Sequence, residues 1–430
     1  MTGRIDLTAN ALAPLWALPW PPPRDLYGHP AYRDFKAFCE RTFPAADKGL
    51  GFSFGLTDAL RAVGVPCLTG GRATPGLSDA ARSLVDAFDA KVVRRRYLCP
   101  LDGADRLPPI RFGAATVGQH SHDELLALFD ATLLERCFGG EPLDPRLSQF
   151  QWLVVEEEVP APPSTGQRAM PFLYENWSRD LGAIDPHAGS HPGPVASALF
   201  GLLLAPWEDW HSSEHDWRAF SIPWIHVATD DVFVRPRAVP GADTLSWEDA
   251  HHPGDDGEAV EYQRPLQVDL HDEAASYLRG FDQRWWDGIE AARSTDLFST
   301  PVEHFLLRGA LSDGMDQIMA HMTAIEAAIG MQSDFSNKGR PRSEKSTATR
   351  RMARRLARLL GDARVEADYA TLFDMRSGFV HGRAMRGSIP SAERDTARRL
   401  ARRAASALVA AANGPAGQGT REDFLTGVAP

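Results

Sequence analysis

The chain has 430 residues, which is enough for two or three domains with sizeable cores. Hydrophobic residues make up 43% and charged residues 24%, and these ordinary values exclude a chain that is disordered throughout. The longest apolar run, residues 195–207, is too short to span a bilayer. It predicts a buried helix, and we expect no association with a membrane.

The net charge of −11 is unevenly distributed along the chain. Residues 301–430 carry 20 Lys and Arg against 14 Asp and Glu, whereas the first 300 residues carry 26 against 43. A basic tail behind an acidic region indicates either a domain that meets a polyanion such as RNA, or basic helix faces that are only solvated.

The four cysteines, Cys39, Cys67, Cys99 and Cys137, are widely spaced and include no C-x-x-C pair. Such spacing is typical neither of a zinc site nor of a disulfide framework. We therefore expect buried free thiols that behave as small apolar groups. Free thiols fit a reducing compartment, so the sequence predicts a cytoplasmic protein.

Residues 1–295 are predicted to form a mixed α/β (α+β) region. Ser78 begins a helix, and Ser121 begins another with Glu124 at capping-box spacing. Further helices are predicted at residues 31–42 and 271–292. Strand-like runs lie at residues 91–99, 110–117, 151–159, 222–234 and 258–270. Glycine, proline and polar residues predict loops at residues 49–55, 160–171 and 250–257.

The composition of this region changes near residue 150. Nine of the eleven tryptophans lie between Trp152 and Trp286, which predicts an aromatic-rich core. The sequence therefore indicates an α/β region at residues 1–150 and an aromatic-rich, β-containing region at residues 151–295. The alternative is that these two regions form a single domain.

From Pro301 onward the pattern is helical throughout. Six apolar residues recur at the spacing of one helix face, namely Leu311, Met315, Ile318, Met322, Ile325 and Ile329. Further helices are predicted at residues 349–360, 365–381 and 391–413, with Gly361 and Gly414 as stops. We therefore expect an all-α domain over residues 300–415 and a frayed tail at residues 416–430.

One segment of this helical region carries residues suited to RNA chemistry. Arg376 and His381 lie five positions apart in the run RSGFVHG. On a straight helix this spacing is a rotation of about 140°, so both reach one site only where the helix ends or distorts, as Gly378 and Gly382 allow. Histidine transfers protons near neutral pH, and arginine holds a phosphate as negative charge develops on it. The two residue types are a sufficient minimum for metal-independent RNA cleavage.

This segment resembles the R-x4–6-H signature of the HEPN superfamily, and its Arg-Ser-x-x-Val-His-Gly form resembles the ApeA-like branch. The resemblance covers about residues 300–412. Its first helix ends in TAIEAAIG, similar to the glutamate-containing helix of that branch, and Glu326 is the glutamate here. A basic second helix and a fourth helix after the motif also fit.

The resemblance implies an up-and-down bundle of four to five helices that pairs with a second copy, so that two Arg/His motifs share a cleft. Active members are endoribonucleases that need no metal or cofactor. Arg376 would bind the scissile phosphate, and His381 would act in acid–base catalysis to leave a 2′,3′-cyclic phosphate. Ser377 stands where many active members have Asn, Asp or His. Glu326 either orients Arg376 or forms a pair on the bundle surface.

The same resemblance implies an effector domain fused to a sensor in bacterial anti-phage defence, with a phage-derived trigger. RNA would follow a path of basic residues, for which the candidates are Arg350, Arg354, Arg355, Arg358 and Arg383. A solvated helix face is the alternative interpretation of these arginines.

Other functions stay open on the sequence. The helical domain is alternatively a non-catalytic module for dimerisation or for binding RNA or protein. His211 and His215 match the H-x-x-E-H pattern of some zinc metallohydrolases, although no third ligand can be named. Residues 51–55 match the G-x-S-x-G pattern of a serine nucleophile, but no buried strand precedes them, so we expect a glycine-rich turn.

Overall fold

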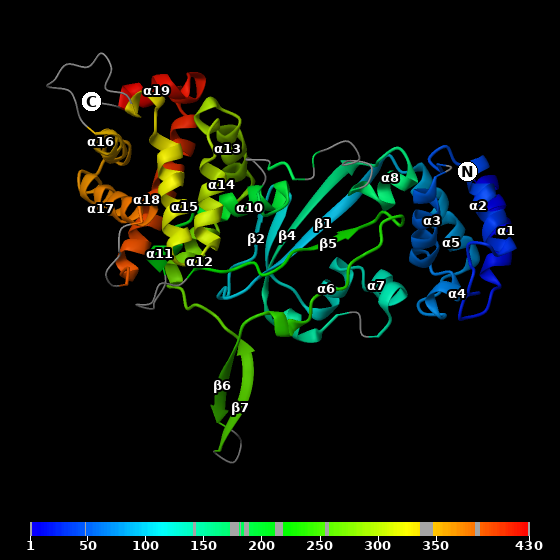
Figure 1. Ribbon diagram of the computed structural model, residues 1–430. Coiled ribbons are helices and arrows are strands. Elements are labelled where there is room, and N and C mark those ends of the chain that lie inside the picture. The colour runs from blue at the N-terminus through cyan, green and yellow to red at the C-terminus, as the bar shows by residue number, and fades with distance from the viewer. Residues whose placement is uncertain are drawn as a thin grey trace. The chain divides into compact units, whose positions relative to one another are not determined.

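Two compact units make up the chain, each assembled from segments that interleave along the sequence (Figure 1). Unit 1 comprises Met1–Pro100, Gln119–Asp185 and Pro223–Leu245, and unit 2 comprises Leu101–Gly118, Pro186–Ile222 and Ser246–Pro430. The sequence had indicated consecutive blocks instead. The computed structural model describes residues 2–47, 49–140, 143–172, 180, 182–184, 189–210, 218–253, 258–335, 347–382 and 388–428.

Unit 1 combines helices with a sheet, as the predicted mixed α/β class requires. Its helices are α1 (Thr2–Trp16), α2 (Pro30–Thr42), α3 (Leu50–Ala62), α4 (Pro66–Thr69), α5 (Leu77–Asp89), α6 (His122–Leu128), α7 (Ala131–Phe138) and α8 (Thr165–Ala169). Two short 3-10 helices, η1 (Pro145–Gln149) and η2 (Ala242–Thr244), accompany them. Its strands are β1 (Val92–Leu101), β4 (Gln151–Pro160) and β5 (His226–Thr229), and β1 lies between the other two.

Aromatic side chains fill the core among the first five helices of unit 1. Phe35 and Phe52 are fully buried there, and the rings of Phe43 and Phe88 stack with centroids 4.1 Å apart. Such ring pairs add roughly 0.5–1.5 kcal/mol to the stability gained from burial of their area. The burial of Phe35 and Cys39 on one face explains why the predicted helix at residues 31–42 forms as α2.

The predicted loop at residues 49–55 is wrong, because α3 begins at Leu50. A Cβ on Gly55 would lie 3.0 Å from the Cβ of Ala169 and 3.2 Å from the carbonyl oxygen of Thr165. The glycine therefore permits close packing of α3 against α8, which offsets its low helix propensity. Ser53 lies inside α3, so it does not occupy a turn after a strand, and the serine-nucleophile pattern carries no chemistry here.

Turn residues divide several elements that the sequence predicted as continuous. Gly113, with φ +52°, separates β2 (Ile110–Phe112) from β3 (Ala115–Gln119), which form an antiparallel hairpin. The predicted capping box at Ser121 and Glu124 is confirmed, but Asp130, with φ +52°, then separates α6 from α7. Asx side chains tolerate this left-handed conformation, and Asp130 also caps the second helix.

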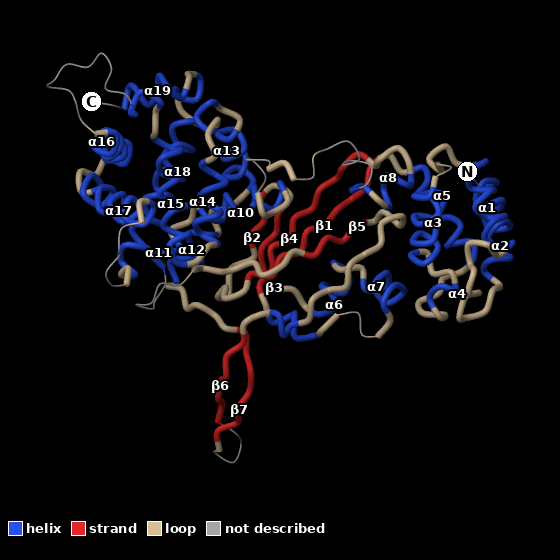
Figure 2. Tube along the Cα trace, viewed as in Figure 1, coloured by secondary structure: helices blue, strands red, loops and turns tan. Residues whose placement is uncertain are grey.

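Unit 2 is largely helical (Figure 2). Its helices are α10 (Gly193–Leu203), α11 (Trp207–Trp210), α12 (Asp272–Leu278), α13 (Gln283–Arg293), α14 (Val302–Leu311), α15 (Gly314–Ile329), α16 (Ala348–Leu360), α17 (Val365–Val380), α18 (Ser391–Ala412) and α19 (Arg421–Val428). It also contains the 3-10 helices η3 (Asp296–Phe298), η4 (Gln332–Phe335) and η6 (Pro415–Gln418), and an antiparallel ribbon of β6 (Trp247–Pro253) and β7 (Ala259–Pro265).

The helical character predicted after Pro301 is confirmed, but the predicted apolar stripe does not lie on one helix, because Ser312 and Asp313 separate Leu311 at the end of α14 from the rest of the stripe on α15. α15 packs against α14, α17 and α18, and α16 packs against α17. The apolar stripe predicted on α15 is buried at Ile318, Met322 and Ile325. The sequence predicted a frayed end, and this is wrong, because Leu425 of α19 is fully buried and Arg421 donates hydrogen bonds to the carbonyl oxygens of Ala327 and Gly330.

The cysteines match their predicted state where the structure describes them. All four are free; Cys39, Cys67 and Cys99 are buried and Cys137 is half-buried. Burial raises the pKa of the Cys99 thiol to about 12, which keeps it neutral at physiological pH. Among the described residues, no helix combines the length and apolar character needed to cross a membrane.

His321 of α15 is a buried ionisable group in the core of unit 2. It is fully buried, and its ring packs closely against Gly309 of α14. A Cβ on this glycine would lie only 2.5 Å from the ring. Neither ring nitrogen has a hydrogen-bond partner among the described residues. Burial, aided by the nearby Arg398, lowers the pKa of His321 to about 3, so the ring is neutral in the folded chain.

This burial predicts a loss of stability in mild acid. The unfolded chain binds a proton to His321 below about pH 6.5 and the folded chain does not, so stability falls as pH drops through that value. Between pH 7 and pH 5 we expect His321 to lower the free energy of unfolding by about 1–2 kcal/mol. Urea unfolding at both pH values checks this: His321→Leu should lose less stability than wild type on acidification, and an identical loss would contradict the prediction.

Candidate functional site

An ion pair joins Arg376 of α17 to Glu326 of α15. Nη1 of Arg376 donates a hydrogen bond of 2.7 Å to Oε1 of Glu326 across the contact between the two helices. The two side chains are 26% and 19% exposed, so the pair is partly shielded but open to solvent on one side. Both interpretations of Glu326 left open by the sequence, a carboxylate that orients Arg376 and a pair on the bundle surface, include this contact.

The environment of Glu326 gives this pair its electrostatic character. Burial raises the pKa of the Glu326 carboxyl, and the Arg376 guanidinium opposes that shift. Tyr369 is fully buried, and burial raises the pKa of its phenol as well. The guanidinium of Arg376 therefore sits where water screens charge less than in bulk solvent.

His381 lies immediately beyond the end of α17. Its backbone N–H donates to the carbonyl oxygen of Ser377 at 3.0 Å, and Gly382, with φ +65°, turns the chain away. The His381 side chain is exposed, whereas Ser377 is half-buried. The predicted helix end with a glycine turn is thus present. No hydrogen bond joins His381 to Arg376 within the described ranges, so the structure brings Arg376 to Glu326 and leaves the imidazole facing solvent.

The arginines of α16 divide into a buried set and an outward set. Nη1 and Nη2 of Arg355 donate to the two carboxylate oxygens of Asp334 at 2.7 and 2.9 Å, and Nη1 also donates to the carbonyl oxygen of Ile329. Arg351 contacts the same aspartate. The expectation that Arg355 lines an RNA path is therefore wrong, because its side chain is buried and both of its terminal nitrogens donate to groups within unit 2.

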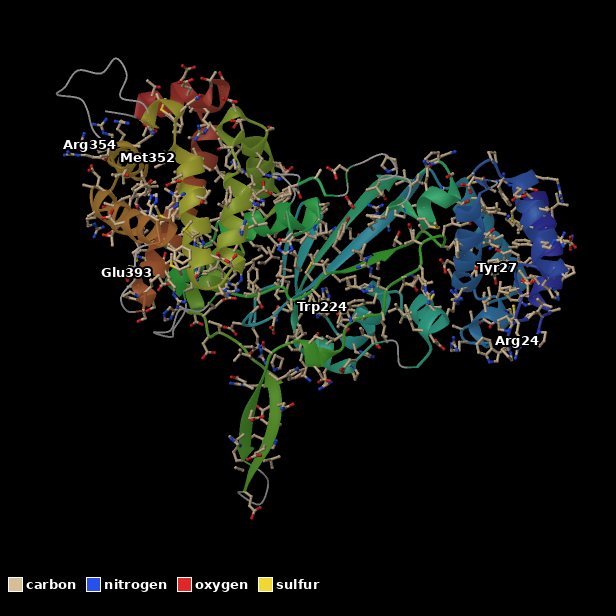
Figure 3. The ribbon with its side chains drawn as sticks, viewed as in Figure 1. Arg24, Tyr27, Trp224, Met352, Arg354 and Glu393 are labelled. Atoms are coloured by element: carbon tan, nitrogen blue, oxygen red, sulfur yellow. The ribbon has the colours of Figure 1, made fainter. Side chains whose placement is uncertain are left out.

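Arg350, Arg354 and Arg358 form the outward set, which we call the α16 arginine row. They recur every four positions, so they share one face of the helix. Arg350 and Arg358 are exposed and Arg354 is half-buried. Figure 3 labels Arg354 on this helix beside the inward-facing Met352. No hydrogen bond or ion pair occupies their guanidinium groups in the part of the chain that the structure describes.

Some sequence candidates cannot be placed, and some contacts were not foreseen. Arg383, His211 and His215 lie outside the described residues. Within those ranges, no cluster of three or more His, Cys, Asp or Glu side chains is arranged to hold a metal. Nothing in the sequence marks Asp334 as the anchor of two arginines, because it lies between the predicted helical segments.

A second unforeseen feature is the exposed apolar pair beside His381. Phe379 and Val380 are 48% and 55% exposed, although both belong to the last turn of α17. Two apolar side chains this exposed at the end of a helix are not evident from the sequence, because their exposure depends on the three-dimensional packing.

Comparison with known proteins identifies no relative of this chain. No protein-family model, curated protein or solved structure matches it.

Proposed function

We propose that the helical region of unit 2 is a HEPN-type endoribonuclease site that cleaves RNA without a metal, with Arg376 and His381 as the acting residues. The observation that carries the proposal is the Arg376–Glu326 pair, in which a half-exposed guanidinium is fixed by a carboxylate from the neighbouring helix. The exposed imidazole of His381 at the end of the same helix supports it. The RSGFVHG run and the helical order from α14 to α18 supply the resemblance to the superfamily.

The reaction class follows from the chemistry of these two side chains. The 2′-oxygen of a ribose attacks the adjacent phosphorus while the bond to the 5′-oxygen breaks, which leaves a 2′,3′-cyclic phosphate and a free 5′-hydroxyl. Arg376 stabilises the negative charge that develops on the phosphoryl oxygens. His381 moves a proton, either from the 2′-hydroxyl or to the departing 5′-oxygen.

A second copy of the chain completes the proposed site. One imidazole cannot accept and donate a proton at the same instant, so two copies of His381 provide the base and the acid. The apolar side chains of Phe379 and Val380, exposed next to His381, are suited to burial against a second copy. Ser377, which follows Arg376 on α17 and is half-buried, is proposed as a polar neighbour of the site.

The α16 arginine row is proposed to hold the RNA backbone. Three guanidinium groups at every fourth position offer separate contacts to successive phosphates. The resemblance further suggests that unit 1 senses a phage-derived trigger and that the ribonuclease is a regulated effector of anti-phage defence.

One observation favours a second candidate function. Glu326 neutralises the charge of Arg376, and a neutralised arginine binds an RNA phosphate less strongly than a free one. The alternative is therefore a non-catalytic module that dimerises and binds RNA or protein through the same surface. This module would retain binding by the α16 arginine row without any cleavage.

The test is incubation of purified full-length protein with total RNA in the presence of EDTA. The proposal predicts chelator-resistant fragments whose 3′ ends carry a cyclic phosphate, and no cleavage of an RNA in which every 2′-oxygen is methylated. Binding of RNA without fragments would favour the non-catalytic module. Cleavage abolished by EDTA would contradict a metal-independent reaction.

A further inference from the structure

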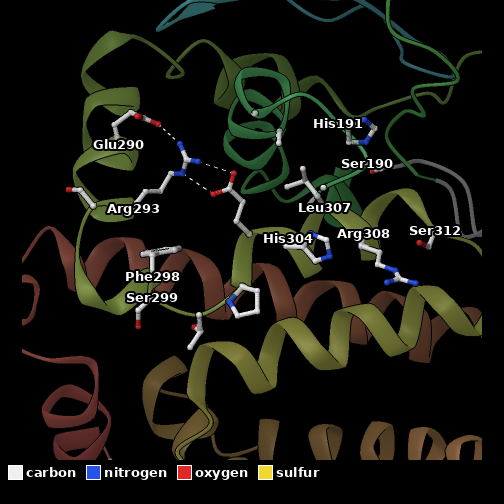
Figure 4. A pocket seen from close by; sticks show the side chains of 17 residues that line it. Ser190, His191, Glu290, Arg293, Phe298, Ser299, His304, Leu307, Arg308 and Ser312 are labelled. Carbon is white, nitrogen blue, oxygen red and sulfur yellow. Dashed lines mark hydrogen bonds and ion pairs between the residues drawn. The ribbon is translucent and has the colours of Figure 1, made fainter. Parts of the chain in front are cut away.

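A large cavity in unit 2 lies between α10, α13 and α14 and is not part of the site described above. It has a volume of about 1180 Å³. Its wall contains residues of all three helices and of the segment before α10, with Phe298 as an apolar side chain. Figure 4 shows the side chains that line it. A space of this size admits a small organic molecule.

One end of the cavity is acidic. Nε and Nη2 of Arg293 donate to the two carboxylate oxygens of Glu303 at 2.8 and 3.1 Å, and Nη1 donates to Glu290 at 2.6 Å. Two carboxylates thus share a single guanidinium, which leaves an excess of acceptor oxygens. Burial raises the pKa of Glu303, although Arg293 opposes that shift, as expected for a carboxyl withdrawn from water. This end is suited to hydroxyl or amino groups that donate hydrogen bonds.

The other end of the cavity is basic. His304 and Arg308 lie four positions apart on α14 and therefore share one face of the helix. His191, from the segment before α10, lines the cavity with them. In Figure 4 these three side chains lie on the side away from the Glu290–Arg293 pair. Among the described residues, no hydrogen bond or ion pair occupies these three polar side chains.

The amino end of α10 adds to the positive character of this basic end. Gly193 is the first residue of the helix and lines the cavity, and a Cβ built on it would meet nothing within 4 Å. A helix start leaves backbone N–H groups outside the helical hydrogen bonds, and such groups attract anions. Pro194 has no N–H, so Gly193 supplies the first of these donors, and its lack of a side chain lets a ligand approach closely. Arg308 supplies the permanent charge, and the imidazoles of His191 and His304 supply further donors to anionic oxygens.

We propose that this cavity binds a small organic phosphate, with the phosphate at Arg308, His304 and His191 and a hydroxyl- or amine-bearing part at Glu290 and Glu303. Because the basic and acidic ends are separate, the cavity favours a molecule with an anionic group at one end and hydrogen-bond donors at the other. Phe298 adds a flat apolar ring to the lining on the side of Arg293, where a sugar or base can pack. A nucleoside monophosphate has these features. The assignment is independent of the RNA-cleavage proposal, because it concerns binding at a different set of residues.

The test is isothermal titration of full-length protein with AMP, inorganic phosphate and adenosine. We expect AMP to bind, Arg308→Gln to weaken AMP binding about 10-fold or more through loss of a charge-assisted contact, and adenosine to bind correspondingly more weakly than AMP. Arg279→Gln, which removes an exposed arginine of the same unit outside the cavity, should leave AMP affinity unchanged. Glu290→Gln should weaken AMP binding and leave inorganic phosphate unaffected.

Two outcomes would overturn the proposal. One is the absence of AMP binding at millimolar concentration in wild type. The other is equal AMP affinity in the wild-type protein and in Arg308→Gln, with both proteins shown to be folded by circular dichroism. Inorganic phosphate that binds as tightly as AMP would contradict the assignment of the acidic end to the organic part.

Discussion

Replacing Asp334 by alanine is expected to reduce the free energy of unfolding by about 3–5 kcal/mol, the usual cost of leaving a buried charge without its partner. Asp334 is fully buried, and the side chains of Arg351 and Arg355 that it binds are only 9% and 5% exposed. Burial alone would raise the pKa of Asp334, but hydrogen bonds from Arg355 and from the Met331 amide outweigh burial and lower it. The carboxylate is therefore ionised and pairs with two guanidinium groups that are themselves largely buried.

Urea unfolding of the full-length protein, followed by circular dichroism, measures this loss. Asp374→Ala is the matched control, because Asp374 is exposed on α17 and its loss should change stability by no more than about 0.5 kcal/mol. The pKa of Asp334 is lower in the folded chain than in the unfolded chain. The ionised carboxylate therefore adds to the free energy of unfolding above the unfolded pKa of about 3.9, and this stabilisation disappears as pH falls further. A loss below about 1 kcal/mol in Asp334→Ala at pH 7 would show that the arginines find other partners.

Replacing Arg376 by alanine is expected to lower the rate of RNA cleavage by about 10²–10³-fold, the usual effect of removing a donor that stabilises developing negative charge. Arg376→Lys should recover little of this activity. Lysine carries the charge, but it has no planar fork that can bind Glu326 and a phosphoryl oxygen together. Arg364→Ala is the control, because that arginine is 89% exposed near the start of the same helix.

A stability measurement separates the catalytic effect of Arg376 from a structural one. Loss of Arg376 leaves Glu326 partly buried without its cation, so Arg376→Ala should also lose stability as pH rises through the raised pKa of that carboxyl. Adding Glu326→Gln should restore stability without restoring cleavage. Cleavage by folded Arg376→Ala at the wild-type rate would remove Arg376 from the mechanism.

The sequence predicted the helices around the candidate site well because their ends carry local signals. Gly361, with φ +65°, ends α16 in a left-handed turn, and Gly382 does the same beyond α17. Thr347 caps α16 by accepting a hydrogen bond from the backbone N–H of Arg350. Each of these signals lies within one turn of the helix end that it specifies, so no knowledge of the rest of the fold is needed.

Features that depend on distant contacts were not predictable in this way. α3 contains two glycines near its start and was predicted as a loop, yet contact of Gly55 with α8 favours the helix. α19 has no strong local pattern, and its order depends on Leu425 and Arg421 packing against residues far away in sequence.

The candidate site was predictable in its residue types but not in its arrangement. The alternation of the α16 arginines follows from helical spacing, because Met352 and Leu356 point inward and Arg355 lies beside them. Arg355 was nevertheless a candidate for an RNA path, with a solvated helix face as the alternative. Its partner Asp334, and the pairing of Glu326 with Arg376, required coordinates, because a carboxylate 21 or 50 positions away gives no local signal.

The most direct test of the proposed chemistry is cleavage of a 5′-labelled RNA oligonucleotide in EDTA by wild type and by His381→Ala, side by side. The proposal predicts a fragment ending in a 2′,3′-cyclic phosphate from wild type and a rate lower by at least about 10²-fold from the variant, as expected on loss of a general acid or base. His252→Ala, which removes an exposed histidine from β6, should cleave at the wild-type rate. Equal cleavage by wild type and His381→Ala would contradict the account.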